Sequence, residues 1–100
     1  MVVGVLRLEL RLFAVHSLKQ KRSQVSRVLS RLRSRYPISV AEVGYQDLYQ
    51  RALLGISMTA CTEAQVASVF RKLEDEIYTL GIAELLDTDI EYLHYGEEIH

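Results

Sequence analysis

The most concentrated chemistry in this chain of 100 residues is a run of cations between positions 17 and 36. The segment contains no Asp or Glu, and seven of the twelve Lys and Arg residues fall within it. Cations on one element can neutralise the phosphates of a polyanion such as RNA, with an affinity that falls steeply as salt rises. Phosphate binding is therefore predicted for this segment, which carries Lys19, Lys21, Arg22, Arg27, Arg31, Arg33 and Arg35.

The start of the segment also has the features of an anion site. Ser17 and Gln20 have the spacing of a capping box, which predicts that a helix begins at Leu18. Backbone N–H groups at the N-terminus of a helix bind anions, and helical spacing directs Arg27 and Arg31 to solvent. The residues of this helix predicted to contact RNA phosphates are Ser17, Lys19, Lys21, Arg22, Arg27 and Arg31.

An uneven charge distribution leaves an alternative for these cations. Residues 1–50 contain nine Lys and Arg against three acids, whereas residues 51–100 contain three against ten. Lys21 and Arg22 would then pair with acids of the last predicted strand, such as Asp87 or Asp89, and would be structural. The same asymmetry permits complementary pairing between two copies of the chain.

A second polar and aromatic group lies in the connection 44–51. A hairpin turn needs only two to five residues, so this connection carries more chemistry than turning requires. Gln46, Gln50 and Arg51 are predicted to hydrogen-bond bases or phosphates, and Tyr45 and Tyr49 to stack on unpaired bases. Alternatively, the tyrosines pack on the sheet, and an ion pair between Asp47 and Arg51 fixes the loop.

Residues suited to catalysis are few. His16, His94 and His100 lack metal-ligand spacing with one another or with the single cysteine. That cysteine, Cys61, is expected to be a buried, inert thiol. The chain also lacks a Gly-rich phosphate loop and a Gly-x-Ser-x-Gly motif. We therefore expect a protein that is not an enzyme and that uses no cofactor or metal.

Composition and length indicate one ordinary globular domain. About half of the residues (49%) are hydrophobic and 25% are charged, so a packed core is expected. Arg7, Glu9 and Arg11 interrupt the N-terminal apolar run, which excludes a signal peptide core or a membrane span there. A single cysteine suits the reducing cytoplasm. We expect a cytoplasmic domain over residues 1–94 with a short tail, 95–100.

The helices and strands that position these groups are predicted from the spacing of apolar residues. From Leu6 to Leu12 leucines alternate with polar residues, which predicts a strand with one buried face. Apolar residues at helical spacing predict helices over 18–36 and 63–80, ended by Pro37 and Gly81 respectively. Three further strands are predicted over 38–43, 52–60 and 84–94.

This βαββαβ order is the ferredoxin-like pattern, an α+β fold with a four-stranded antiparallel sheet and two helices on one face. The open face of the sheet is either solvated or pairs arginine against acid with a second copy, which would make a homodimer. It lacks the exposed aromatic residues with which RNA-recognition domains stack bases. Its predicted members are Arg7, Glu9, Arg11, Leu53, Ser57, Asp87, Asp89 and Glu91.

Three segments carry a family resemblance: SLKQKR at 17–22, SVAEV at 39–43 and QDLYQRA at 46–52. With them the chain resembles the bacterial YlxP-like family, a conserved domain of unknown function, from position 1 to about position 92. The resemblance implies a ferredoxin-like domain. It also implies a gene neighbourhood shared with a translation initiation factor, a ribosome-binding factor and a tRNA pseudouridine synthase.

The predicted function is therefore a non-enzymatic RNA- or ribosome-associated protein, such as a small-subunit assembly or translation-linked factor. The alternative is a homo-oligomeric module that binds a protein or a small ligand through the open sheet face and does not contact RNA.

Overall fold

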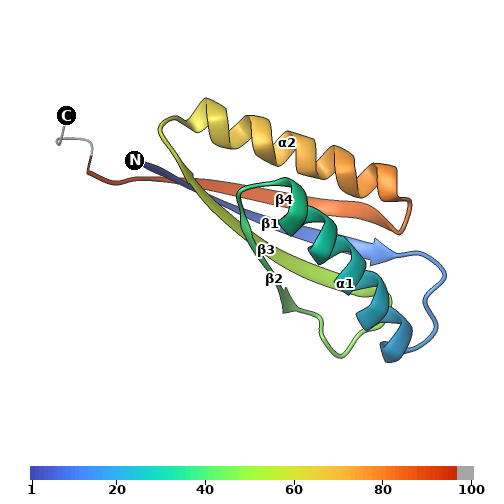
Figure 1. The fold of residues 1–100 in the computed structure, drawn as a ribbon. Coiled ribbons are helices and arrows are strands. Elements are labelled where there is room, and N and C mark those ends of the chain that lie inside the picture. Colours follow the sequence, from blue (N-terminus) through green and yellow to red (C-terminus); the bar gives the residue numbers. More distant parts are fainter. Residues whose placement is uncertain (97–100) are drawn as a thin grey trace.

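The computed structural model describes residues 1–96 and contains four strands and two helices in the predicted βαββαβ order (Figure 1). The ferredoxin-like α+β fold is confirmed. The first strand begins at Val2, before the alternation at Leu6, because Val2 and Gly4 continue its buried face. The elements are β1 (Val2–Leu12), α1 (Leu18–Arg35), β2 (Ser39–Gly44), β3 (Arg51–Ala60), α2 (Glu63–Leu80) and β4 (Ala83–His94).

The sheet has the strand order β2-β3-β1-β4, with every neighbouring pair antiparallel, so β2 and β4 are its edges. Both helices cover one face (Figure 1). Arg7 lies opposite Gly55 of β3 and Asp89 of β4, on the uncovered side. This register confirms the predicted membership of the open face.

The core lies between this sheet and the helices. Leu6, Leu8 and Leu10 of β1 are fully buried against the covered face. A Cβ atom at Gly4 would lie 2.2 Å from Val66 Cγ1, so glycine lets α2 approach β1 closely. From the helices, Val28 and Leu32 of α1 and Phe70, Leu73 and Ile77 of α2 complete this cluster.

The helix ends follow the predicted caps. Ser17 Oγ accepts a hydrogen bond from the Gln20 N–H at 3.1 Å. Thr62 and Gln65 form a reciprocal capping box at the start of α2, and Gly81 ends that helix with a left-handed φ of 66°. These contacts satisfy backbone groups that a helix leaves unpaired at its ends. Neither helix is long and apolar enough to cross a membrane within the described residues.

The predicted tail begins as a continuation of the sheet. The Tyr95 N–H donates to Met1 O at 2.9 Å, and the Met1 amino group donates to Tyr95 O at 3.0 Å. Backbone pairing between the two chain ends therefore extends past His94. Residues 97–100 of the predicted tail lie outside the described residues.

Candidate functional site

Helix α1 carries the predicted cations and divides them between its two sides. Lys21, Val25, Val28 and Leu32 lie on the buried side. The opposite side exposes Lys19, Arg22 and Arg27, together with Arg33. No acidic residue lies in the first turn. The fate of each cation therefore depends on which side of the helix it occupies.

Lys21 does not reach solvent. Its side chain is only 2% exposed, and its Nζ lies 2.9 Å from Glu42 Oε2 of β2. The same Nζ donates a hydrogen bond to the carbonyl oxygen of Tyr45 at 2.5 Å. The predicted phosphate contact by Lys21 is therefore wrong, and so is its alternative pairing with Asp87 or Asp89. The side chain instead joins the beginning of α1 to the end of β2.

Arg31 and Arg35 share one carboxylate with Tyr36. Arg31 Nε donates to Glu76 Oε2 and Arg35 Nη1 donates to Glu76 Oε1, each at 3.1 Å. The Tyr36 hydroxyl donates to Oε1 at 3.3 Å. The hydrogen bond from Arg31 outweighs desolvation of the carboxyl group, and with the charge of Arg35 it lowers the pKa of Glu76. Arg31, predicted to bind phosphate, thus already has a carboxylate partner on α2.

The other side of α1 keeps its positive charge. Among residues 1–96, no carboxylate lies within 4.0 Å of Lys19, Arg22, Arg27 or Arg33. Arg27 donates to the uncharged side chain of Gln24 at 3.3 Å, and Arg33 donates to the carbonyl of Val40 at 2.8 Å. The same surface exposes four serines: Ser23, Ser26, Ser30 and Ser34. We call these eight residues the α1 outer surface.

A shallow groove of about 500 Å³ runs beside the α1 outer surface. Three of its exposed serines line it with Arg27, Arg31 and Leu80. Arg31 is already bound to Glu76, and the Ser34 hydroxyl donates to the Arg31 carbonyl at 3.0 Å. The guanidinium group of Arg27 and the hydroxyl groups of Ser26 and Ser30 border this groove. Such a set suits phosphate oxygens, which accept hydrogen bonds from Arg and Ser side chains.

The loop between β2 and β3 is held by a carboxylate of β1. Arg51 Nη2 donates to Glu9 Oε2 at 2.8 Å, and the Tyr45 hydroxyl donates to Glu9 Oε1 at 3.0 Å. The bond to Glu9, with the carboxylate's charge, raises the pKa of Tyr45. The predicted ion pair between Asp47 and Arg51 is therefore wrong, because Arg51 pairs across the sheet.

These contacts also limit which loop residues can meet a nucleic acid. The Arg51 guanidinium carbon lies 6.0 Å from the centroid of the Tyr45 ring. Arg51 therefore occupies part of the ring surface on which a base would stack. Gln46, Tyr49 and Gln50 are exposed. Lys21 joins this loop to the beginning of α1. The structure thus brings the loop next to the beginning of α1.

On the open sheet face, the charged residues of β1 are paired within the chain. Arg7 contacts Asp89 at 3.8 Å, Glu9 pairs with Arg51, and Arg11 pairs with Glu84. The three charged residues of β1 on this face thus each have a partner in the same molecule. Asp87 and Glu91 of this face form no ion pair within 4.0 Å among residues 1–96, and the pairing of two copies through this face stays a prediction.

Two residues were missed in the analysis of the sequence, Glu42 and Glu76, although both carried a signal. Glu42 follows Val40 by two positions, so both lie on the covered side of β2. Glu76 lies beside Leu73 and Ile77 in the apolar stripe of α2. A carboxylate at such a position requires a cation, since unpaired buried charge is costly. Both were thus available as structural partners for the basic helix.

No metal site is assembled among the described residues, and the single cysteine does not lie where it was predicted. Residues 1–96 contain no group of three or more His, Cys, Asp or Glu residues that could hold a metal ion. Cys61 is exposed, so the expectation of a buried thiol is wrong. It lies before the α2 cap, where its N–H donates to Gln65 Oε1 at 3.0 Å.

Known structures confirm the class to which the chain belongs, an α+β domain of the ferredoxin-like fold. A de novo designed protein with a ferredoxin fold, LFR1 1, matches with a TM-score of 0.62 at 16% identity, covering 97% of this chain and 90% of the design. A structural-genomics protein, YJCS, also reaches a TM-score of 0.62, at 8% identity over 92% of this chain and 99% of its own. At such identities the likeness concerns the fold alone.

The sequence comparisons define the family. Residues 3–90 match the model described as "Protein of unknown function (DUF503)", and the chain belongs to this family. It is 29% identical over 72 residues to the uncharacterized protein YlxP of Bacillus subtilis (strain 168), a match that covers 72% of this chain and 78% of that protein. The YlxP-like resemblance is thereby confirmed.

Proposed function

We propose that this protein binds the phosphate backbone of structured RNA, as a non-enzymatic RNA- or ribosome-associated factor. The observation that carries the proposal is the α1 outer surface, whose four cations have no carboxylate within 4.0 Å among residues 1–96. Within residues 1–96, three of the seven cations of the basic segment have carboxylate partners, which are Glu42 for Lys21 and Glu76 for Arg31 and Arg35. An excess of positive charge therefore remains on this side of the molecule.

The shape of this surface suits a backbone rather than a base sequence. Lys19 and Arg33 lie fourteen residues apart on one helix, a span of about 21 Å at the α-helical rise. Cations and hydroxyl groups in such a row contact phosphates and fix register, but they do not read base edges. The binding is expected to depend on RNA charge and shape.

The loop supplies the groups that would contact bases. Gln46, Tyr49 and Gln50 are exposed in the loop whose Tyr45 carbonyl accepts a hydrogen bond from Lys21, at the beginning of α1. Base stacking is assigned to Tyr49 rather than Tyr45, whose hydroxyl is bound to Glu9 and whose ring carries Arg51. The gene neighbourhood implied by the family resemblance favours RNA as the polyanion.

The test compares two double variants that each remove two cations from an exposed helix. R22A/R27A alters the α1 outer surface, and R71A/K72A is the matched control on α2. Binding to a small-subunit ribosomal RNA fragment is measured by fluorescence anisotropy from about 50 to 200 mM salt. We expect R22A/R27A to weaken binding at least tenfold and to reduce the slope of log K against log salt by about one to two.

The control variant should bind like the unmodified chain. Equal effects of the two double variants, or binding that does not respond to salt, would overturn the proposal. Unchanged RNA binding together with an altered sedimentation coefficient for R22A/R27A would support the self-assembling module instead.

A further inference from the structure

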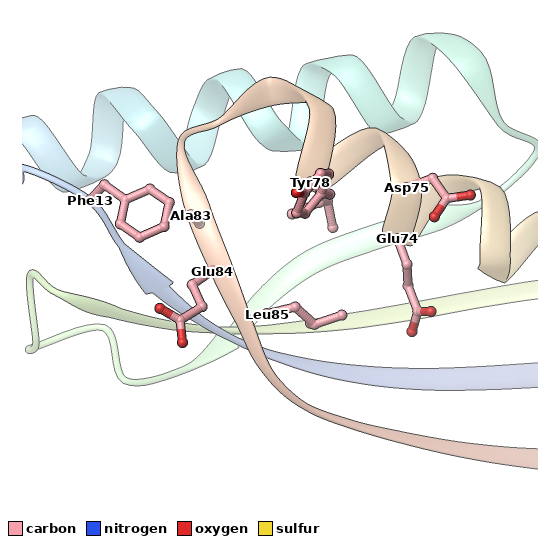
Figure 2. A pocket seen from close by; sticks show the side chains of 8 residues that line it. Phe13, Glu74, Asp75, Tyr78, Ala83, Glu84 and Leu85 are labelled. Carbon is pink, nitrogen blue, oxygen red and sulfur yellow. The ribbon is translucent and has the colours of Figure 1, made fainter.

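A partly open hollow with no role assigned so far lies between the C-terminal half of α2 and the beginning of β4. Its volume is about 470 Å³, within the range of small-ligand sites. Figure 2 shows Phe13 and Glu84 on one side, Glu74 and Asp75 on the other, and Leu85 between them. Ile77 and Ala83 complete its lining with Tyr78. We call this hollow the α2–β4 cavity.

Two aromatic residues that line the cavity expose apolar ring surface to solvent, which is unfavourable. Phe13 is half exposed, and Tyr78, at 86%, is the most exposed aromatic residue among residues 1–96. Neither ring contributes to the core cluster. The faces of aromatic rings attract cations through their quadrupole, an attraction that strengthens as water is excluded.

The acidic groups of the cavity set the charge of what it can hold. No cation lies within 4.0 Å of the carboxylates of Glu74 and Asp75 in the described part of the chain. Desolvation and repulsion by Asp75 raise the pKa of Glu74, against an opposing effect of Arg71. An added positive charge would relieve the repulsion between these two neighbours. The floor, by contrast, is apolar.

The rim already holds one cation of a specific kind. The Arg11 guanidinium carbon lies 5.4 Å from the centroid of the Phe13 ring, and Arg11 also forms an ion pair with Glu84. An aromatic face and a carboxylate together thus hold a planar guanidinium at this edge. Tyr78 and Glu74 supply a second aromatic ring and carboxylate on the other side of the cavity. No cation within residues 1–96 forms an ion pair with Glu74.

We propose that the α2–β4 cavity binds a second guanidinium group, between Tyr78 and the carboxylates of Glu74 and Asp75. A guanidinium suits the site better than an ammonium because it stacks flat on an aromatic ring and is more weakly hydrated. The group would come from an arginine side chain of a peptide or from a free guanidino compound. The cavity lies on the α2 side of the fold, so the site is separate from the proposed RNA surface.

The experiment titrates the full ¹⁵N-labelled chain with acetyl-arginine-amide and with acetyl-citrulline-amide, its uncharged isostere, and follows backbone amide shifts. We expect saturable shifts at Phe13, Tyr78 and Leu85, and at least tenfold tighter binding of the arginine probe. Equal binding of the citrulline probe, or shifts confined to other parts of the molecule, would overturn the proposal.

Matched variants test the residues. E74Q/Y78A should weaken the arginine probe at least tenfold, whereas E91Q/Y95A, which removes the same groups outside the cavity, should bind as before. Both tyrosines are exposed, so a urea unfolding curve should confirm that neither variant is unfolded. Unchanged binding by E74Q/Y78A would contradict the assignment.

Two additional probes identify the source of the group. A capped Gly-Arg-Gly peptide that binds more tightly than agmatine indicates a peptide arginine, and the reverse order indicates a free guanidino compound. Either order supports guanidinium binding. The R22A/R27A variant should retain this binding, so failure of the RNA proposal and failure of this one are distinguishable.

Discussion

The two helices have equal lengths and pack on the same sheet face, yet they differ in the balance of charge that they present to solvent, although α2 also exposes Arg71 and Lys72. Helix α1 exposes cations and serines, and it has no acid in its first turn. Helix α2 begins with Glu63 in its first turn and carries Glu74 and Asp75 beside β4. The core thus needs only the inner side of each helix, and the outer sides can differ in charge without affecting it.

The contrast also extends to cations within α1. Lys21 and Lys19 lie two residues apart, but one is buried against Glu42 and the other is exposed. Position around the helix, rather than residue type, decides whether a lysine holds the fold together or faces solvent. Single substitutions in the two helices can test this division.

The largest effect is expected for K21M. Removal of the amine leaves the Glu42 carboxylate and the Tyr45 carbonyl without their partner. Loss of one member of a buried pair costs about 3 kcal/mol when the remaining charge keeps some solvent. Urea unfolding at pH 7 measures this loss. K19M, the matched control, should change stability by less than about 0.5 kcal/mol, and equal losses would refute the distinction.

A smaller effect is expected for E76Q, and it should depend on pH. The folded protein lowers the pKa of Glu76, so its contribution is present above the ordinary carboxyl pKa of 4.5 and is lost as pH falls through the lower folded value. Unfolding curves between pH 7 and pH 2 should show the unmodified chain losing its advantage over E76Q in acid. E91Q should keep the unmodified profile. A pH-independent difference would show that the charge of Glu76 is not what stabilises the helix pair.

The smallest effect is expected for K19E, and its sign is opposite. A carboxylate in the first turn interacts favourably with the helix dipole, as Glu63 does in α2. We expect a gain of about 0.5 kcal/mol in the free energy of unfolding, together with weaker RNA binding. Thermal unfolding and the anisotropy assay measure the two. A variant that is both less stable and unchanged in RNA affinity would contradict the division of roles along α1.

The fold was predictable because its signals are local. Leucine alternation between Leu6 and Leu12, the caps at Ser17 and Thr62, and the stop at Gly81 each depend on neighbouring residues, and each was confirmed. Pairings between distant residues were not predictable in the same way. Asp47 is close to Arg51 in sequence, but the strand register places Glu9 in contact with Arg51 instead.

The site was only partly predictable for the same reason. The exposed positions of Lys19 and Arg27 followed from the helical period. The partners of Lys21 and Arg31 depend on how α1 lies against β2 and α2, which no single segment encodes. The α2–β4 cavity likewise combines residues from β1's end, α2 and β4.

The position of β4 at the edge of the sheet has a consequence for solubility. Asp87, Asp89 and Glu91 point to the same face of a strand whose outer N–H and C=O groups have no neighbouring strand. Two molecules meeting edge to edge would bring these carboxylates together, and like charges on an exposed edge discourage such growth. The charges on β4 therefore oppose fibre-like extension of the sheet from this edge.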